Sequence, residues 1–254
     1  MEKTVQIVFS PTGGTQKAAD MLAEGLDKPV EKVNLSSASE DFSSVKLKEE
    51  DVAIIAVPSF GGRVPALAAE RLAGIDGDGA RCILMCVYGN RAYEDTLIEL
   101  NDIAEKCGFR VIAAVAAVAE HSICRQYAAG RPDEEDRKEL TGYAKQIQAK
   151  LEKGATPFFG IPGNRPYKKA GGASLVPKAD DRCNGCGICA AKCPAQAIDA
   201  ADPKKTDAKK CISCMRCVAV CPQHARSANK LMVAAAAMAL KKTCSVRKEC
   251  ELYL

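Results

Sequence analysis

The chain has 254 residues, which is long for one hydrophobic core, and its 27% of charged residues is close to the average for globular proteins. These values exclude a mainly disordered chain and favour one large and one small domain. The longest apolar run, residues 231–240, is about half as long as a membrane crossing requires, so we expect a buried helix there and no membrane span.

Short β-branched runs alternate with amphipathic stretches from residue 1 to about residue 153. The expected strands are residues 5–9, 30–35, 52–57, 82–88 and 111–118. The expected helices are residues 16–26, 65–72, 93–107 and 133–151, and the last has a proline and acidic residues at its start, as helix N-termini favour. Five apolar strands that alternate with helices predict an α/β fold with a doubly wound parallel sheet, covered on both faces.

Three further segments follow this α/β region. Glycine and proline are frequent between residues 154 and 177, which is typical of a linker. A cysteine-rich block comes next, and the alanine-rich tail from Ser227 favours one helix to about Leu252. We therefore expect an α/β domain (1–156), a linker (157–176), a cysteine-rich domain (177–226) and a C-terminal helix (227–254).

The chain contains fourteen cysteines, and eight of them form two motifs of the form C-x2-C-x2-C-x3-C-P. No signal peptide precedes the first expected strand, so we expect a cytoplasmic protein whose reduced thiols bind metal. Three thiolates at this spacing can hold three corners of a cubane iron-sulfur cluster, while the fourth projects away. Structural zinc is the alternative, but it has no use for a third cysteine at the same spacing.

The cysteine block resembles the bacterial two-cluster ferredoxin family, with Pro194 and Pro222 in their usual places. The resemblance implies a small α+β domain with two 4Fe-4S clusters, in which the fourth cysteine of each motif serves the other cluster. Cluster 1 would then be held by Cys183, Cys186, Cys189 and Cys221. Cluster 2 would be held by Cys211, Cys214, Cys217 and Cys193.

The formal charge of +4 does not by itself indicate a nucleic-acid partner. It counts every cysteine as neutral, whereas a cluster with its four thiolates carries roughly −2. Two clusters would offset the positive charge. We therefore expect no binding to nucleic acid.

A loop rich in glycine and threonine, residues 10–15, lies between the first expected strand and the first helix. Backbone N–H groups, hydroxyls and glycines at a helix start are the features that bind phosphate, although a plain strand-to-helix turn is the alternative. The loop is neither a Walker A motif nor G-x-G-x-x-G. Residues 58–65 and 88–93 follow the third and fourth strands, so they would meet this loop at the edge where open parallel sheets bind ligands.

These three loops resemble the flavodoxin family, and the resemblance covers residues 3–153. It implies that FMN binds with its phosphate on the first loop, at Ser10, Thr12, Gly13, Gly14 and Thr15. It implies further cofactor-binding residues around the flavin ring: Pro58, Ser59, Phe60, Gly61, Gly62, Tyr88, Gly89, Asn90, Arg91 and Tyr93. The chain lacks tryptophan, which often stacks on the flavin in this family, so Tyr93, Tyr88 and Phe60 are the candidates for stacking.

Each of these assignments has a simpler alternative. Phe60 and Tyr88 are also interpretable as core aromatics, and Arg91 as a solvated charge. His121 follows the fifth strand, where it is placed to donate a proton or a hydrogen bond to a flavin or substrate, or only to order its loop. Cys124 is a candidate redox thiol. The remaining cysteines are not expected to bind iron: Cys82, Cys86 and Cys107 as buried hydrophobic residues, and Cys244 and Cys250 in the last helix.

Together the two parts resemble the flavodoxin and ferredoxin fusions of anaerobic microbes. The implied function is electron transfer between FMN and two clusters, with redox partner proteins as electron donor and acceptor. The alternative is an FMN-dependent reductase of a small molecule with the clusters as internal wires, which requires convergent polar groups beside the flavin. A redox sensor is a third interpretation, and the sequence leaves open a homodimer.

Overall fold

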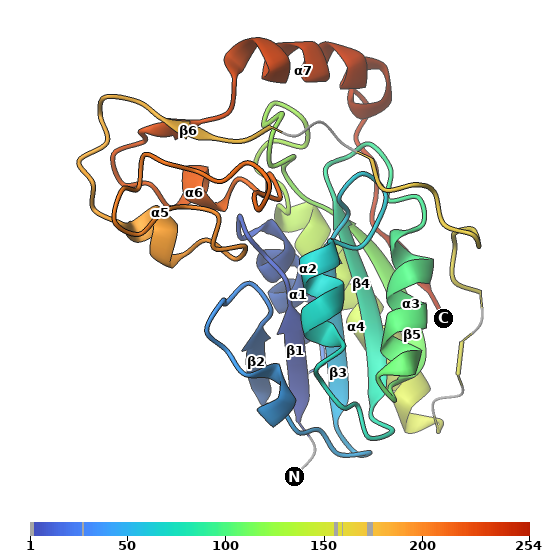
Figure 1. The fold of residues 1–254 in the computed structure, drawn as a ribbon. Helices are drawn as coiled ribbons and strands as arrows, with labels where there is room; N and C mark the ends of the chain where they lie inside the picture. The colour runs from blue at the N-terminus through green and yellow to red at the C-terminus, as the bar shows by residue number, and fades with distance from the viewer. Residues whose placement is uncertain (1–2, 27, 155–156, 159, 172–174) are drawn as a thin grey trace.

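The computed structural model describes residues 3–26, 28–154, 157–158, 160–171 and 175–254 (Figure 1). Its main sheet has the strand order β2-β1-β3-β4-β5-β8. The first five strands are parallel, and their order is that of flavodoxin-like doubly wound sheets. The strands are β1 (Thr4–Val8), β2 (Val30–Asn34), β3 (Val52–Pro58), β4 (Arg81–Tyr88), β5 (Arg110–Val118) and β8 (Glu251–Tyr253). The predicted five-stranded parallel sheet is therefore confirmed, with one strand added.

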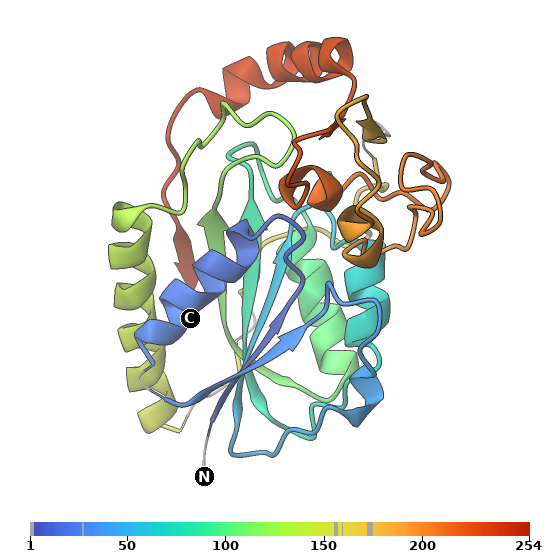
Figure 2. The same ribbon diagram turned by 90° about the vertical axis from the view of Figure 1, so that its left-hand side faces the viewer.

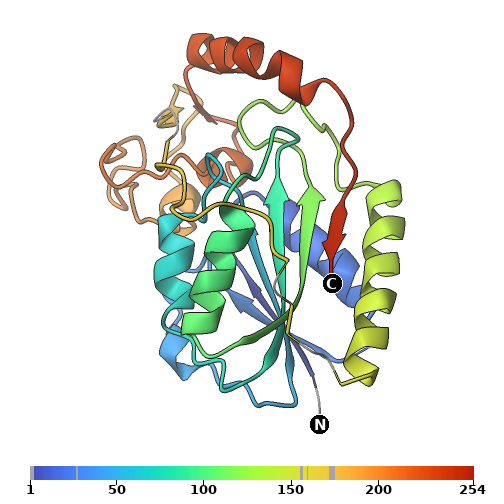
Figure 3. The ribbon, with the colours of Figure 1, turned by 90° about the vertical axis from the view of Figure 1, so that its right-hand side faces the viewer.

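Both faces of the sheet are apolar, because alternate side chains of each strand pack into two separate cores. Ile7 and Ile55 belong to one core, and Val8 and Ile54 to the other. The first core is covered by α2 (Ala66–Leu72) and α3 (Thr96–Lys106), and the second by α1 (Gly14–Glu24) and α4 (Glu134–Glu152). Figures 2 and 3 show these helix layers on opposite sides of the sheet.

The start of α4 shows how local sequence determines a helix boundary. The Asp133 carboxylate accepts hydrogen bonds from the N–H groups of Glu135 (3.1 Å) and Asp136 (3.2 Å). The Asp136 carboxylate accepts from the N–H of Asp133 (2.8 Å), which completes a capping box. The acidic start that the sequence predicts is thus confirmed within one residue.

The cysteine-rich unit is small and contains both helices and strands. Its strands β6 (Lys178–Ala179) and β7 (Arg226–Ser227) pair antiparallel, and its helices α5 (Ile188–Ala191) and α6 (Arg216–Ala219) each begin inside one cysteine motif. A 3-10 turn, η1 (Phe42–Ser44), lies in the larger unit. In Figure 1 the cysteine-rich unit lies at the upper left, on the side of β2 and near the carboxyl ends of the strands.

The predicted C-terminal helix is wrong in its second half. α7 (Lys230–Cys244) ends eight residues earlier than expected, and residues 251–253 form β8. β8 pairs antiparallel with β5, with Val115 opposite Leu252 (Figure 3). The physical reason is that β5 would otherwise present an unpaired sheet edge, which the chain covers with its own end.

The segment expected to be a linker is held against the α/β unit where the structure describes it. The Asp95 carboxylate accepts from the N–H groups of Asn164 (2.9 Å) and Lys168 (2.7 Å). Arg165 donates to Asp102 at 2.9 Å through its Nε. Among the described residues, none of the helices is both long and apolar enough to cross a membrane.

Candidate functional site

A cavity of about 720 Å³ lies at the carboxyl ends of the parallel strands. The loops that follow β1, β3, β4 and β5 form its floor, and parts of the cysteine-rich unit and of α7 also line it. In Figure 1 these segments meet between the top of the sheet and α7. The sheet reverses its winding between β1 and β3, which is where doubly wound folds bind ligands.

The first loop presents the start of α1 to this cavity. Thr12, Gly14 and Thr15 line the cavity, and Gly13 precedes the helix with a φ of 95°, a conformation that favours glycine. The Ser10 hydroxyl accepts from the N–H of Gln16 at 2.9 Å. Ser10 and Gly13 are not among the described residues that line the cavity. Their predicted contact with phosphate would therefore be indirect.

These features fit a phosphate group. The first N–H groups of a helix lack partners within the helix, and they carry a partial positive charge. The hydroxyls of Thr12 and Thr15 supply further donors beside them. No basic side chain is needed for such a site, because oriented backbone donors alone bind phosphate in other folds.

The loop after β3 lines the cavity along its whole turn, from Pro58 to Gly62. Phe60 and Arg63 exchange two backbone hydrogen bonds around the turn, at 3.0 and 3.2 Å. Gly61 and Gly62 have φ values of 61° and 85°, as a tight hairpin turn requires. A Cβ on Gly61 would lie 2.1 Å from the carbonyl oxygen of Gly171, so the turn excludes any larger residue.

The three aromatic candidates for flavin stacking are placed differently. Phe60 is half-buried and lines the cavity, whereas Tyr88 also lines it but is buried in the core. Tyr93 packs edge-on against Tyr88, with ring centroids 5.3 Å apart, and its hydroxyl contacts that of Tyr253 at 2.7 Å. The accessible ring of Phe60 is therefore the candidate that the geometry favours.

Two residues predicted to line the flavin ring hold the C-terminal segment instead. The Asn90 amide donates to the carbonyl oxygens of Cys244 (2.9 Å) and Val246 (2.8 Å), and its oxygen accepts from the N–H of Lys248 (3.3 Å). Neither Asn90 nor Tyr93 is among the described residues that line the cavity. Sequence reasoning placed them at the ring because it did not include a strand after α7.

Gly89 and Arg91 do line the cavity, as predicted. Arg91 is partly neutralised, because its guanidinium donates to both carboxylate oxygens of Glu94 at 2.9 Å. Gly89 packs against His121, and a Cβ on this glycine would lie 2.7 Å from the imidazole Cδ2. The close approach explains why glycine stands at this position.

His121 lines the cavity and also orders its own loop. Its Nδ1 accepts from the N–H groups of Ile123 (3.2 Å) and Cys124 (3.1 Å). These bonds assign the proton to Nε2, and burial lowers the pKa of the imidazole. His121 therefore orders its own loop as a neutral imidazole, and its donation of a hydrogen bond to a flavin or substrate stays a prediction.

Cys124 also lines the cavity but is poorly suited to a redox role. It is buried, and burial raises the pKa of its thiol, which disfavours the reactive thiolate. The thiol lies 3.9 Å from the carbonyl oxygen of Val233 in α7. Its surroundings are those of a small buried residue under the helix.

The roof of the cavity was not predicted from the sequence. Ala236, Ala239 and Leu240 of α7 line it from above, and Leu175 and residues 211–214 line it from the cysteine-rich unit. The only sequence signal for this arrangement was the apolar run in α7. The sequence predicts a buried helix for that run, but most of α7 is exposed, including Leu231 and Met238.

The eight motif cysteines fold into two loops of similar shape. The N–H of Ala197 donates to the Cys193 sulfur (3.3 Å), and the N–H of Ala225 donates to the Cys221 sulfur (3.4 Å). In both motifs the N–H donor lies four residues after the cysteine that accepts, so the internal repeat extends to the backbone hydrogen bonds. Hydrogen bonds of this kind stabilise thiolate ligands of iron-sulfur clusters.

The fourth cysteine of the first motif lies beside the second motif. The pKa of Cys214 is raised to about 12 and that of Cys217 to about 11, mainly by burial and to a smaller extent by the neighbouring Cys193 and Cys211. Cys193 therefore lies near the cysteines of the second motif, and the crossed ligation stays a prediction. Three of these four cysteines are buried and Cys211 is half-buried, so their thiolates would require compensating positive charge, which the iron of a cluster would supply.

Contacts between the two units lie beside this second group. Arg216 in α6 donates to the carbonyl oxygens of Pro11 (2.9 Å) and Ser10 (3.4 Å) in the phosphate loop. Arg71 in α2 donates to the carbonyl oxygen of Pro194 at 2.6 Å. Each arginine thus ties one unit to the backbone of the other, next to a ligand-bearing loop.

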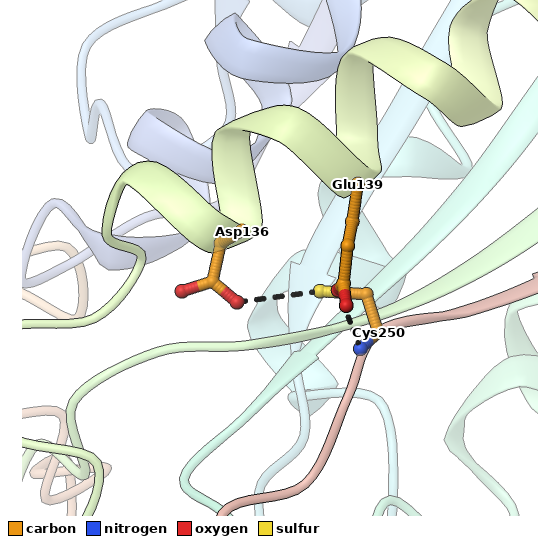
Figure 4. A group of neighbouring side chains, drawn as sticks. All are labelled: Asp136, Glu139 and Cys250. Atoms are coloured by element: carbon orange, nitrogen blue, oxygen red, sulfur yellow. Dashed lines mark hydrogen bonds between the residues drawn. The ribbon is translucent and has the colours of Figure 1, made fainter.

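Cys250 lies in a separate polar cluster with Asp136 and Glu139, whose ligand-type atoms are within 4.8 Å of one another (Figure 4). Its N–H donates to Glu139 at 3.0 Å, and its sulfur lies 3.6 Å from Asp136. The Asp136 carboxylate also accepts two hydrogen bonds from the buried Arg131 guanidinium. This group of side chains anchors the C-terminal strand, and its carboxylates already accept hydrogen bonds from the protein.

Cys82 and Cys86 are buried in the first core, as predicted, and Cys107 packs against it.

Comparisons with known proteins agree with this division of the chain. The family model described as a 4Fe-4S dicluster domain matches residues 182–226, which contain all eight motif cysteines. A search of curated proteins found no match.

Among solved structures, the chain is similar to a flavodoxin from the domain Archaea, with 16% identity over 60% of this chain and 99% of that chain, at a TM-score of 0.42. It is similar to the flavodoxin of Streptococcus pneumonia TIGR4, with 22% identity over 59% of this chain and 98% of that one, at a TM-score of 0.39. It is also similar to flavodoxin 1 from Bacillus cereus, with 17% identity over 57% and 97%, at a TM-score of 0.41. These likenesses concern the fold alone.

The strand order and the dicluster match define the class of protein. The chain joins a flavodoxin-like α/β unit to a ferredoxin-type unit, as the sequence predicted.

Proposed function

We propose that the protein transfers electrons between one FMN and two 4Fe-4S clusters and exchanges them with a redox partner protein. The observation that carries the proposal is that one cavity is lined both by the flavodoxin-like loops and by Cys211 and Cys214. A flavin takes up one or two electrons and a cluster takes up one, so their combination converts pairs into single electrons.

The residues of the chain have separate roles in this proposal. Thr12, Thr15 and the N–H groups at the start of α1 bind the phosphate. Phe60 and the turn at Gly61 hold the ring, and His121 donates a hydrogen bond from Nε2. α7 limits the access of water from above.

The cluster ligands follow the crossed assignment. Cys183, Cys186, Cys189 and Cys221 hold cluster 1, and Cys211, Cys214, Cys217 and Cys193 hold cluster 2. The proposed domain boundaries are those given by the sequence, except that the C-terminal helix ends at Cys244. A cytoplasmic location and a homodimer stay predictions.

A small-molecule reductase is the second candidate function. The observation in its favour is that Arg91, His121 and Ser122 line the cavity together beneath the roof formed by α7. Such convergent polar groups beside a flavin are what an enzyme requires. An enzyme would show saturable oxidation of the reduced protein by a small organic acceptor, whereas a carrier would show no saturation with such an acceptor.

The proposal is tested by the cofactor content of the protein purified without oxygen. We expect about eight irons, eight sulfides and one FMN per chain. About four irons, or zinc in place of iron, would refute the assignment of two clusters. Absence of flavin in a preparation with full iron would refute the FMN site alone.

A further inference from the structure

The two cysteine motifs are copies of one loop, so differences between them carry information. Alignment of Cys183 with Cys211 places Gly185 opposite Ser213 and Gly187 opposite Met215. These four residues all have left-handed backbone, with φ values of 76° at Gly185, 52° at Ser213, 74° at Gly187 and 61° at Met215. The backbones match, and the side chains around them therefore show what each loop faces.

The second loop faces the flavodoxin-like unit. Cys211, Ile212, Ser213 and Cys214 line the cavity. The Ser213 hydroxyl accepts from the N–H of Leu175 at 3.0 Å, and Arg216 holds the phosphate loop. This loop therefore packs against the cavity, Leu175 and the loop after β1.

The first loop faces outward. Asn184, Gly185 and Cys186 are exposed, and Ile188 is 39% exposed. Ile188 aligns with Arg216 of the second motif. Arg216 donates a hydrogen bond to the carbonyl oxygen of Pro11 in the loop after β1. An exposed isoleucine thus stands where the other copy has a half-buried arginine that contacts the flavodoxin-like unit.

We propose that the cluster held by the second motif exchanges electrons with the flavin, and that the cluster of the first motif exchanges them with an external one-electron redox protein. This inference rests on the proposed function. The partner docks on the face formed by residues 184–188, named here the outer loop, because the equivalent face of the repeat is already seated on the flavin-binding unit. The cluster of the second motif is named here the inner cluster, and that of the first motif the outer cluster.

When bound, FMN would supply one or two electrons and each cluster would carry one at a time, with any proton of the reduced flavin exchanged with solvent. Cys211, Cys214, Cys217 and Cys193 would hold the inner cluster beside the cavity, and Cys183, Cys186, Cys189 and Cys221 would hold the outer cluster that faces the partner protein. The same residues would serve when the partner is the electron donor.

Serine variants of two equivalent ligands test the order of the clusters. Cys214 lines the cavity and Cys186 is its exposed counterpart in the other motif. The full chain would be loaded with FMN and clusters without oxygen, and the relaxation of the one-electron-reduced flavin signal would be measured by EPR. We expect Cys214→Ser to slow this relaxation and Cys186→Ser to leave it close to wild type.

The test remains valid if either variant loses its cluster, because loss of the inner cluster alone removes the nearby paramagnet. A larger effect of Cys186→Ser, or equal effects of both variants, would overturn the proposed order. Wild-type protein that lacks flavin or iron would instead overturn the proposed function, so the two failures are distinguishable.

A surface variant that keeps all ligands tests the docking face. Ile188→Asp places a charge on the outer loop, and Leu231→Asp places one on α7, where Leu231 is 82% exposed. The rate of electron exchange would be measured with a reduced two-cluster bacterial ferredoxin and, separately, with dithionite. We expect Ile188→Asp to slow the reaction with ferredoxin at least about fivefold, as loss of a central interface residue does, without affecting the reaction with dithionite. An unchanged rate with ferredoxin, or an equal loss in Leu231→Asp, would overturn the docking face.

Discussion

Replacement of Asn90 by alanine tests how the C-terminal segment is held over the cavity. Asn90 is buried, and its side chain makes three hydrogen bonds to the backbone of residues 244–248. Its φ of 65° lies in the left-handed region, which asparagine tolerates better than alanine. The variant therefore loses three bonds and gains backbone strain.

The expected cost follows from these contacts. Hydrogen bonds contribute about 0.5–1.5 kcal/mol each, and the left-handed backbone adds about 1 kcal/mol for alanine. We expect the free energy of unfolding to fall by about 3–5 kcal/mol, because three hydrogen bonds are lost and the carbonyl group of the buried Cys244 is left without this donor. Urea denaturation under anaerobic conditions, followed by circular dichroism, measures this change.

Two further variants separate the hydrogen bonds from the strain. Asn90→Asp keeps the tolerance of left-handed backbone but loses both donors, so we expect it to be destabilising as well. Asp78→Ala makes a comparable change at an exposed position with a φ of 44°, and we expect a loss near 1 kcal/mol. The reasoning is refuted if Asn90→Ala costs no more than Asp78→Ala.

The remaining predictions concern the flavin site, the clusters and pH. Gly61→Ala should raise the Kd for FMN at least about tenfold in a fluorescence titration, because its Cβ would strain the turn by about 1–3 kcal/mol against Gly171. Cys193→Ala should damage the cluster of the second motif, measured by EPR of the reduced protein. Arg165 lowers the pKa of Asp102 to about 2, so the stability that this carboxylate contributes is complete above the unfolded pKa of about 4 and is lost as pH falls toward 2, measured by acid unfolding.

Each of these predictions has a control or a contradicting outcome. Gly142→Ala in α4 meets nothing within 4 Å and should leave FMN binding unchanged. Loss confined to the cluster of the first motif in Cys193→Ala would contradict the crossed ligation. Asp102→Asn should flatten the acid limb of the stability curve, and an unchanged curve would show that this carboxylate does not contribute.

The parts of the fold that depend on local sequence were predictable. The five parallel strands are continuous apolar runs, and the start of α4 is marked by its own capping residues. The turn at Gly61 and the two cysteine motifs were equally visible, because fixed spacing and glycine content are local properties.

The parts that depend on distant contacts were not predictable. β8 has three residues, and it forms because β5 offers an unpaired edge. Asn90 and Tyr93 contact the segment that leads into this strand and the strand itself, and neither lines the cavity. The hydrogen bond from Arg216 to the carbonyl oxygen of Pro11 joins residues that are 205 positions apart, and no local sequence pattern predicts such a pair.

A reductive titration tests the central claim most directly, since it counts the redox centres as well as their atoms. The protein with FMN and two clusters should take up about four electrons per chain, two in the flavin and one in each cluster. Optical spectra would follow the flavin and EPR would follow the clusters during the same titration. Uptake of about two electrons, with no EPR signal from reduced clusters, would contradict the account.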